Sequence, residues 1–190
     1  MIEKSDIRNA MKMLRHSVDE ESAMMLAGIV EGKISGLRCF DACTRLFLYS
    51  SLPDELPTLH MIEKWSKCKS LYLPRVSGDG MMMVAYGTGE LRKGAYNIYE
   101  PSGDDIVDSF NPTDVAIIPG VAFDRNCNRL GRGKGYYDKF LAGFCGVKIG
   151  VCLDFRLIDH IPCNQHDVPM DAVITPDITI VSDKSIHNLF

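Results

Sequence analysis

The fold of this chain is decided by the apolar run Val115-Ala116-Ile117-Ile118-Pro119 and by the loop downstream of it, which ends in Gly131-Arg132-Gly133-Lys134-Gly135-Tyr136-Tyr137-Asp138. A short, uninterrupted run of apolar residues is typical of a strand that is buried on both faces of a sheet. Residues 135–144, which follow the loop, have a helical pattern. Strand, glycine-rich loop and helix in this order predict a crossover unit of an α/β fold.

Outward from this stretch, helices and strands alternate along the chain. The first helix is predicted over 5–16, and the second begins at a capping box of Ser17 and Glu20 and ends near Gly36. Residues 87–113 are rich in Gly, Pro, Asn and Asp and are predicted to be loops. The pattern is completed by a helix over 58–68 and by strands over 46–49, 71–74, 81–86, 148–153, 172–174 and 178–181.

These elements predict an α/β fold, a single three-layer domain over residues 1–190 with a largely parallel central sheet flanked by helices. Ligands of such sheets bind beyond the carboxyl ends of the strands, where loops lead into helices. The functional site is therefore expected at the loop that follows Pro119.

The composition bounds the class of protein. The chain has 190 residues, of which 46% are hydrophobic and 24% charged, and this excludes a mainly disordered or fibrous chain. Its formal net charge of −4 argues against a general nucleic-acid binder, because phosphate contacts need a basic surplus. No apolar run approaches a membrane span, and early charged residues argue against a secretory signal. We expect a soluble, cytoplasmic monomer without nucleic-acid or membrane partners.

The cysteines give little evidence of a site. Their odd number, seven, in a chain of this size favours reduced and mostly buried thiols. A zinc site of Cys163, His166 and His160 is the alternative, but no paired C-x-x-C provides its second half.

The loop 129–138 has the composition of an anion site. Its three glycines at alternate positions let the backbone approach a ligand closely, and their amides precede a helix N-terminus. Arg129, Arg132 and Lys134 add positive charge. A tight surface turn with solvated charges is the alternative, less favoured because clustered like charges repel without a counter-anion. The loop matches neither the Walker A motif nor the dinucleotide motif G-x-G-x-x-G.

The first predicted helix carries a second basic element. Lys4 and Arg8 share one face of it, and Lys12 and Arg15 continue that face. From periodicity alone a solvated helix face is the better interpretation. The functional alternative is that Lys4 and Arg8 reach the same phosphates as the loop.

Asp138 closes the loop and suits Mg²⁺, which takes one or two protein carboxylates together with phosphate oxygens. Stabilisation of the helix dipole by an acidic residue in the first turn is the alternative. Asp167 and Asp171 are both candidates for a second carboxylate.

The chain resembles the 5-formyltetrahydrofolate cyclo-ligase family, whose members are also called 5,10-methenyltetrahydrofolate synthetases. The family pattern P-G-x-A-F-D corresponds to residues 119–124, and R-L-G-R-G-x-G-Y-Y-D corresponds to residues 129–138. This long central motif is highly specific. Further matches in the family's order are Lys4 with Arg8, residues 49–55 with Thr58, residues 73–76, Glu100-Pro101, and a late H-D-x-x-x-D with Thr175.

The resemblance implies an enzyme that uses ATP and Mg²⁺ to convert 5-formyltetrahydrofolate to 5,10-methenyltetrahydrofolate, with ADP and phosphate as products. In that family the formyl oxygen takes the γ-phosphoryl group, N10 of the folate attacks the activated carbon, and phosphate leaves as the ring closes. No enzyme nucleophile is needed, in agreement with the absence of a Ser-His or Cys-His motif in the sequence. Catalysis is then mainly positioning and charge neutralisation.

The resemblance also implies roles for individual residues. ATP is expected at Lys4, Arg8, Arg129, Leu130, Gly131, Arg132, Gly133, Lys134, Gly135, Tyr136 and Tyr137, and the folate at Arg8, Ser50, Glu55, Arg132 and Tyr136. The expected catalytic residues are Arg132, Lys134 and Tyr136, and the expected Mg²⁺ ligands are Asp138 and Asp171. A carboxylate such as Glu55 suits a pterin edge, which offers paired donors. Simpler interpretations are a surface carboxylate near a helix start for Glu55 and a packed core aromatic for Tyr136.

Two residues depart from the family pattern. Cys127 stands where Gly is frequent, which predicts a different backbone conformation there, and Arg156 stands where Gln is expected. Both departures also suit a paralogue with another substrate. Two other functions stay open. One is a non-catalytic nucleotide- or folate-binding regulator, and the other is a sugar-phosphate isomerase-like enzyme that needs phosphate binding but neither ATP nor Mg²⁺.

Overall fold

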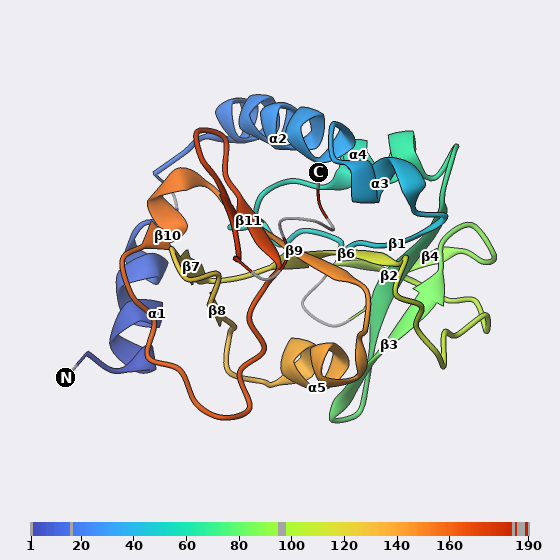
Figure 1. Cartoon of the computed structure of the whole chain (residues 1–190). Helices are drawn as coiled ribbons and strands as arrows, with labels where there is room; N and C mark the ends of the chain where they lie inside the picture. The colour runs from blue at the N-terminus through green and yellow to red at the C-terminus, as the bar shows by residue number, and fades with distance from the viewer. Residues whose placement is uncertain (1, 16, 95–97, 184, 186–188, 190) are drawn as a thin grey trace.

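A seven-stranded sheet forms the centre of the computed structural model, which describes residues 2–15, 17–94, 98–183, 185 and 189 (Figure 1). In spatial order its strands are β12 (Thr179–Val181), β11 (Ala172–Ile174), β9 (Val147–Val151), β6 (Val115–Pro119), β1 (Arg45–Phe47), β2 (Ser70–Ser77) and β3 (Gly80–Ala85). The five inner strands are parallel, and the two edge strands are antiparallel to their neighbours. The predicted α/β fold with a largely parallel sheet is confirmed.

Helices cover both faces of this sheet (Figure 1). On one face lie α2 (Glu20–Ser35), α3 (Arg38–Ala42) and α4 (Leu59–Trp65), and on the other lies α5 (Tyr136–Gly143). Alternate residues of β6 point to opposite faces, so Ile117 packs in the core under α2 and Ile118 in the core under α5. Three layers result, as predicted. That residues 1–190 form one domain stays a prediction.

A third, smaller core joins the N-terminal helix to the body of the protein. Helix α1 (Lys4–Met13) packs beside a small sheet of β10 (Leu157–Ile158), β7 (Ala122–Asp124) and β8 (Arg129–Leu130), and the short 3-10 helix η2 (Asp154–Arg156) precedes β10. Ile7 and Met11 of α1 are buried here against Val121, Leu130 and Ile161. Because β8 leads into the glycine-rich loop, this packing brings α1 close to that loop.

The structure corrects several predicted boundaries. The first helix ends at Met13 rather than near residue 16. The capping box of Ser17 and Glu20 is wrong, because Asp19 is the N-cap of α2 and its side chain accepts a hydrogen bond of 2.9 Å from the amide of Ser22. An aspartate one residue before the helix reaches these amides directly, and the Ser17 hydroxyl instead donates to the carbonyl of Leu14.

Short elements were missed where turn-forming residues surround them. Strands β4 (Leu91–Lys93) and β5 (Tyr99–Pro101) pair antiparallel within the predicted loop 87–113, of which 95–97 lie outside the described residues. Helix α3 was also not predicted. Elements of three to five residues carry too little periodicity to be recognised against flanking Gly and Pro.

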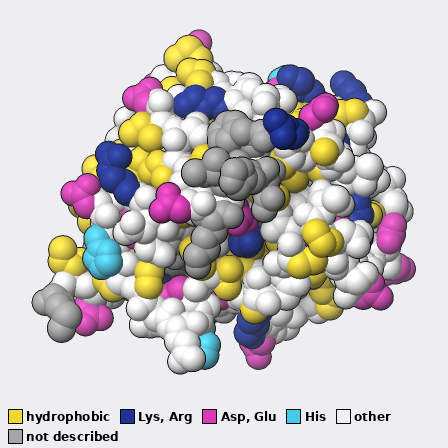
Figure 2. Space-filling view, in the orientation of Figure 1, with side chains coloured by type: hydrophobic (Ala, Val, Ile, Leu, Met, Phe, Trp, Pro, Cys, Tyr) yellow, Lys and Arg dark blue, Asp and Glu magenta, His cyan; other side chains and the backbone are white. Residues whose placement is uncertain are grey.

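No helix among the described residues is long and apolar enough to cross a membrane. On the face drawn in Figure 2, Lys and Arg side chains alternate with Asp and Glu rather than gathering in one continuous basic surface.

Asp124, at the end of β7, organises the turn that leads into the site. Its carboxylate is fully buried and accepts hydrogen bonds from the amides of Asn126, Asn128 and Ile161 and from the Asn128 side chain, each at 2.9 Å. Within the same turn, Cys127 has a φ of 62°, in the left-handed region that favours glycine. The predicted change of backbone conformation at Cys127 is therefore wrong, because the residue adopts the conformation in which glycine is common, at a cost of about 1 kcal/mol.

Asp124→Ala is expected to lower the free energy of unfolding by about 3 kcal/mol, because three buried amides lose their acceptor. Urea denaturation followed by circular dichroism measures this change. Asp159→Ala removes an exposed carboxylate of the same region and is the control. Equal midpoints for the two variants would show that Asp124 does not hold the turn.

Candidate active site

A cleft of about 110 Å³ lies beyond the carboxyl end of β6, at the edge of the sheet where the sequence places the site. It is lined by Tyr49, Ser50, Leu52, Glu55, Pro74, Val76, Met81, Ile98, Glu100, Pro119, Gly120, Val121, Arg129 and every residue from Gly131 to Asp138. The predicted glycine-rich loop therefore meets Ser50 and Glu55 in one cavity, although these two residues lie far from the loop in the sequence.

The backbone of the loop has the conformation that its glycines allow. Gly133 and Gly135 have φ values of 96° and 72°, and Gly135 is the N-cap of α5. The amides of Gly133, Lys134 and Gly135 have no acceptor in the part of the chain that the structure describes. Successive amides of this kind ahead of a helix N-terminus form an anion-binding concavity.

Arg129 holds the two ends of the glycine-rich loop together. Its side chain is only 4% exposed, and it donates 3.3 Å to the carbonyl of Pro119 and 2.6 Å to a carboxylate oxygen of Asp138. The guanidinium also lies 5.4 Å from the ring centroid of Tyr137. One side chain thus fixes the end of β6 and the start of α5 to each other. Because its guanidinium is already bonded to protein groups, Arg129 serves to shape the loop rather than to bind a phosphate freely.

Arg132 is the exposed guanidinium of the loop, and it contacts two acidic side chains from the turn after β1. It lies 2.6 Å from Asp54 and 3.2 Å from Glu55. Burial raises the pKa of Glu55, and the charge of Arg132 only partly opposes this effect. Glu55 is therefore a buried acceptor at the wall of the cleft, and not the surface carboxylate of the simpler interpretation.

Arg156 holds the same turn from the other side. It is 2% exposed and donates 2.8 Å to the carbonyl of Val121 and 2.6 Å to the carbonyl of Asp54. That these contacts differ from those of a family member with glutamine stays a prediction. Sequence reasoning did not identify Asp54, the carboxylate shared by Arg132 and Arg156.

Three further predicted residues, Lys134, Tyr136 and Ser50, line the cleft without an ion pair among the described residues. Lys134 is exposed and has no ion-pair partner among the residues described, so it carries the unpaired positive charge of the loop. Tyr136 is half-buried and lines the cleft, which places it outside the main core clusters. Ser50 also lines the cleft, where its hydroxyl donates 2.8 Å to the carbonyl of Tyr99.

Three predicted nucleotide residues do not line the cleft. Leu130 is buried in the third core and turns its side chain away. Lys4 pairs with Asp167 at 2.5 Å. Arg8 approaches the loop from behind, where its Nε donates 2.8 Å to the carbonyl of Gly131, and it lines a neighbouring groove.

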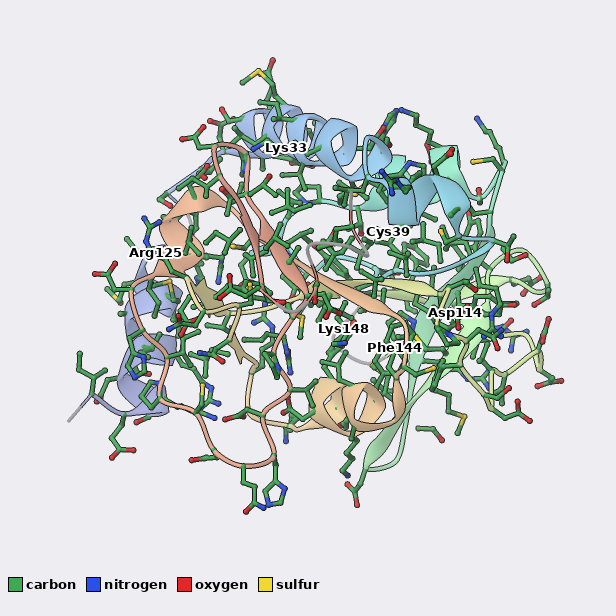
Figure 3. All side chains as sticks on the ribbon, in the orientation of Figure 1. Lys33, Cys39, Asp114, Arg125, Phe144 and Lys148 are labelled. Atoms are coloured by element: carbon green, nitrogen blue, oxygen red, sulfur yellow. The ribbon has the colours of Figure 1, made fainter. Side chains whose placement is uncertain are left out.

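The structure separates the two predicted metal ligands. Asp138 lies in the cleft, whereas Asp171 precedes β11 at the opposite edge of the sheet and accepts 2.8 Å from the amide of Lys148, near the start of β9 (Figure 3). Because β6, β9 and β11 are parallel, their starts and ends lie on opposite edges. A shared site of Asp138 and Asp171 is therefore wrong.

Asp167, the other candidate, pairs with Lys4 of α1 and lies near Arg129, at the start of the loop. Burial acts to raise its pKa, but hydrogen bonds from Lys4 and from the amide of Asn164, with the nearby charge of Arg129, lower it overall. Within the described residues, no three His, Cys, Asp or Glu side chains form a metal cluster. A divalent ion here would therefore need oxygens from a bound phosphate, which is the usual coordination of Mg²⁺.

The apolar wall of the cleft was only partly visible in the sequence. Met81 of β3 and Ile98, which directly precedes β5, belong to no motif. They reach the cleft because β3 pairs with β2 and because β5 lies beside β2. Such residues follow from strand pairing, which short-range patterns do not reveal.

Comparisons with known proteins identify the family of this chain. The profile of the 5-formyltetrahydrofolate cyclo-ligase family matches residues 1–176. A probable 5-formyltetrahydrofolate cyclo-ligase of Caenorhabditis elegans is 30% identical over 95% of this chain and 96% of its own length. One from Schizosaccharomyces pombe is 29% identical over 89% of this chain and 90% of its own length.

A solved structure has the same fold. The NMR structure of Aquifex aeolicus 5,10-methenyltetrahydrofolate synthetase superposes with a TM-score of 0.84 at 31% identity and covers 95% of this chain and 93% of that one. With the family profile matched over residues 1–176 of the sequence, the chain belongs to the 5-formyltetrahydrofolate cyclo-ligase family of enzymes.

Proposed function

We propose that this protein converts 5-formyltetrahydrofolate to 5,10-methenyltetrahydrofolate at the expense of ATP, and releases ADP and phosphate. The observation that carries the proposal is the loop of Gly133, Lys134 and Gly135. Its amides and its lysine have no partner among the residues that the structure describes, and they line a cleft with a buried carboxylate, Glu55, in its wall. The loop suits a phosphate chain, and the carboxylate suits the donor edge of a pterin.

In the proposed reaction the formyl oxygen attacks the γ-phosphorus of ATP, and ADP leaves. N10 of the folate then attacks the activated formyl carbon, and the oxygen departs as phosphate when the ring closes. No side chain forms a covalent bond. The enzyme holds the two substrates in line and neutralises the charge of the transferred phosphoryl group, the usual contributions to phosphoryl transfer.

The residues divide between the two substrates as follows. The amides of Gly131–Gly135, with Lys134, hold the phosphates, and Glu55, Ser50 and Tyr136 bind the folate. Arg132 stands between them. Its pair with Asp54 is partly exposed and contributes at most about 1 kcal/mol, so a phosphate can compete with Asp54 for the guanidinium. Arg129 and Tyr137 shape the loop, and Lys4 and Arg8 support it from behind.

The residues present fit Mg²⁺ bound together with nucleotide. Asp138 offers one carboxylate oxygen that does not bond to Arg129, and its side chain is 37% exposed at the cleft. Asp138 would hold the ion, with Asp167 near the same loop. When bound, the ion would offset the charge of the phosphate oxygens.

A non-catalytic regulator is the second candidate from the sequence. The enclosed Glu55 and the brace of Arg129 on Asp138 favour an enzyme, since both orient groups more precisely than binding alone requires. A monomeric, cytoplasmic protein without nucleic-acid partners stays our expectation.

The purified protein is expected to form the methenyl product, followed by its ultraviolet absorbance, only when ATP, Mg²⁺ and 5-formyltetrahydrofolate are all present. Coupled detection of ADP should give one ADP per product. Nucleotide binding by calorimetry without any turnover would identify the regulator instead, and phosphate-ester isomerisation without ATP or metal would identify the isomerase-like alternative.

Arg132→Gln is expected to lower kcat/KM roughly 30- to 1,000-fold, because a preorganised charged donor is lost. This loss corresponds to about 2–4 kcal/mol of transition-state stabilisation. Arg125→Gln removes an exposed guanidinium from the turn before β8 and is the matched control (Figure 3). If both variants keep wild-type turnover, Arg132 is only a solvated loop residue.

Asp138→Asn is expected to raise the Mg²⁺ concentration for half-maximal activity about tenfold. Asp171→Asn should leave that concentration unchanged and lower the thermal midpoint, because Asp171 bonds Lys148 and Ser185 away from the cleft. Titration of activity with Mg²⁺ and differential scanning fluorimetry separate the two effects. A shift of the Mg²⁺ requirement in both variants would restore the sequence prediction of Asp138 and Asp171 as joint ligands.

A further inference from the structure

Arg156 is a buried arginine beside the cleft, with only 2% of its surface exposed. It lines the neighbouring groove together with Arg132 and Val121, which also line the cleft. Its guanidinium is held in place by the bonds that it donates to the carbonyls of Val121 and Asp54. Because an arginine keeps its positive charge when it is buried, the protein holds a fixed cation next to the turn that carries Asp54.

The carboxylate of Asp54 joins two guanidinium groups through different oxygens. Its Oδ1 lies 2.6 Å from Nη2 of Arg132, and its Oδ2 lies 3.4 Å from Nη2 of Arg156. Within the described part of the chain, Asp54 forms no other ion pair. Burial acts to raise the pKa of Asp54, but the hydrogen bond and charge of Arg132, with the charge of Arg156, lower it overall. Asp54 is therefore ionised near neutral pH and shares its negative charge between a partly exposed and a buried cation.

A phosphate bound to Arg132 changes this sharing. In the structure Arg132 uses Nε and Nη2 for its contacts with Asp54 and Glu55. A two-pronged bond to a phosphate through both terminal nitrogens takes Nη2, so Nη2 has to release Asp54, whereas Nε can stay with Glu55. The released carboxylate and the phosphate then lie on either side of one guanidinium, and like charges within about 4–6 Å of each other repel.

Arg156 is placed to offset this repulsion. Its anchors are backbone carbonyls, so its position does not depend on that of Arg132. Its present contact of 3.4 Å with Oδ2 is longer than a strong charged hydrogen bond, which is about 2.7–2.9 Å. The carboxylate of Asp54 can therefore move closer to Arg156 when it loses Arg132.

We propose that Arg156 is a positioning residue for nucleotide binding, which keeps the charge of Asp54 compensated while Arg132 exchanges that carboxylate for a phosphate. This inference rests on the proposed function, since it assumes a phosphate at the glycine-rich loop. Arg156 itself touches no substrate and acts through Asp54. Without Arg156 the released carboxylate opposes the phosphates, and the nucleotide binds more weakly.

Two single variants and their combination test this role. Arg156→Gln is expected to raise KM for ATP about five- to tenfold, because the charge of Asp54 loses its remaining partner. Asp54→Asn is expected to lower KM for ATP about two- to threefold, because Arg132 is released. In the double variant KM for ATP should stay within about twofold of that of Asp54→Asn, since no carboxylate charge is left to compensate.

Arg45→Gln is the matched control. Arg45 also pairs with a buried aspartate, Asp114, but this pair lies at the start of β1 and β6, on the sheet edge opposite to the cleft. The control should lower the thermal midpoint, measured by differential scanning fluorimetry, and leave KM for ATP unchanged.

An equal rise of KM for ATP on Arg156→Gln in the presence and absence of the Asp54 charge shows a merely structural role and overturns the inference. An unchanged or higher KM for ATP in Asp54→Asn also overturns it, and this result decides the matter even if Arg156→Gln does not fold.

Failure of the proposed reaction is distinguishable from failure of this inference. If the wild type has no turnover, calorimetric titration with a non-hydrolysable ATP analogue replaces KM, and the same order of affinities supports the role of Arg156. A wild type that binds no nucleotide refutes both the reaction and the inference. Normal turnover with equal KM for ATP in wild type and Arg156→Gln overturns the inference alone.

Discussion

The site depends on one buried guanidinium. Arg129 joins the carbonyl of Pro119, at the end of β6, to the carboxylate of Asp138, in the first turn of α5. The loop between these elements is thereby closed at its base, and its glycines adopt positive φ values above that base. Because a free loop of this length loses much conformational entropy on binding, a loop that is fixed in advance binds an anion at lower cost.

A second set of charges connects the two halves of the site. Arg156, Asp54 and Arg132 form a continuous chain from the carbonyl of Val121 to Glu55. The chain ties the turn after β1 to the strand end that precedes the glycine loop. A change at Arg132 therefore reaches the wall of the cleft through Glu55 and the neighbouring groove through Asp54.

Much of the fold could be predicted because the central strands are locally distinctive. The run from Val115 to Pro119 is buried at every position. The helix predicted over 135–144 has Gly135 as its N-cap and extends from Tyr136 to Gly143. Of the loop residues that the central motif names, all except Leu130 line the cleft. Short elements such as β4 and α3 could not be found, since their pairing depends on distant partners.

The errors in the site have the same physical origin. Asp171 has the same charge and a similar sequence context to Asp167, and only the direction of the parallel strands shows that it lies on the far edge. Asp54 lies within the matched stretch 49–55 but was given no role there. It gains its role from Arg132 and Arg156, which are 78 and 102 residues away. Sequence patterns locate a loop well, whereas partners from other elements appear only with the tertiary structure.

A crystal structure with a non-hydrolysable ATP analogue, Mg²⁺ and 5-formyltetrahydrofolate tests the central claim most directly. We predict phosphate oxygens on the amides of Gly133 to Gly135, the Arg129–Asp138 pair intact, and the pterin ring against Glu55. Nucleotide bound elsewhere, with the loop empty and Arg132 still held by Asp54 and Glu55, would contradict the account.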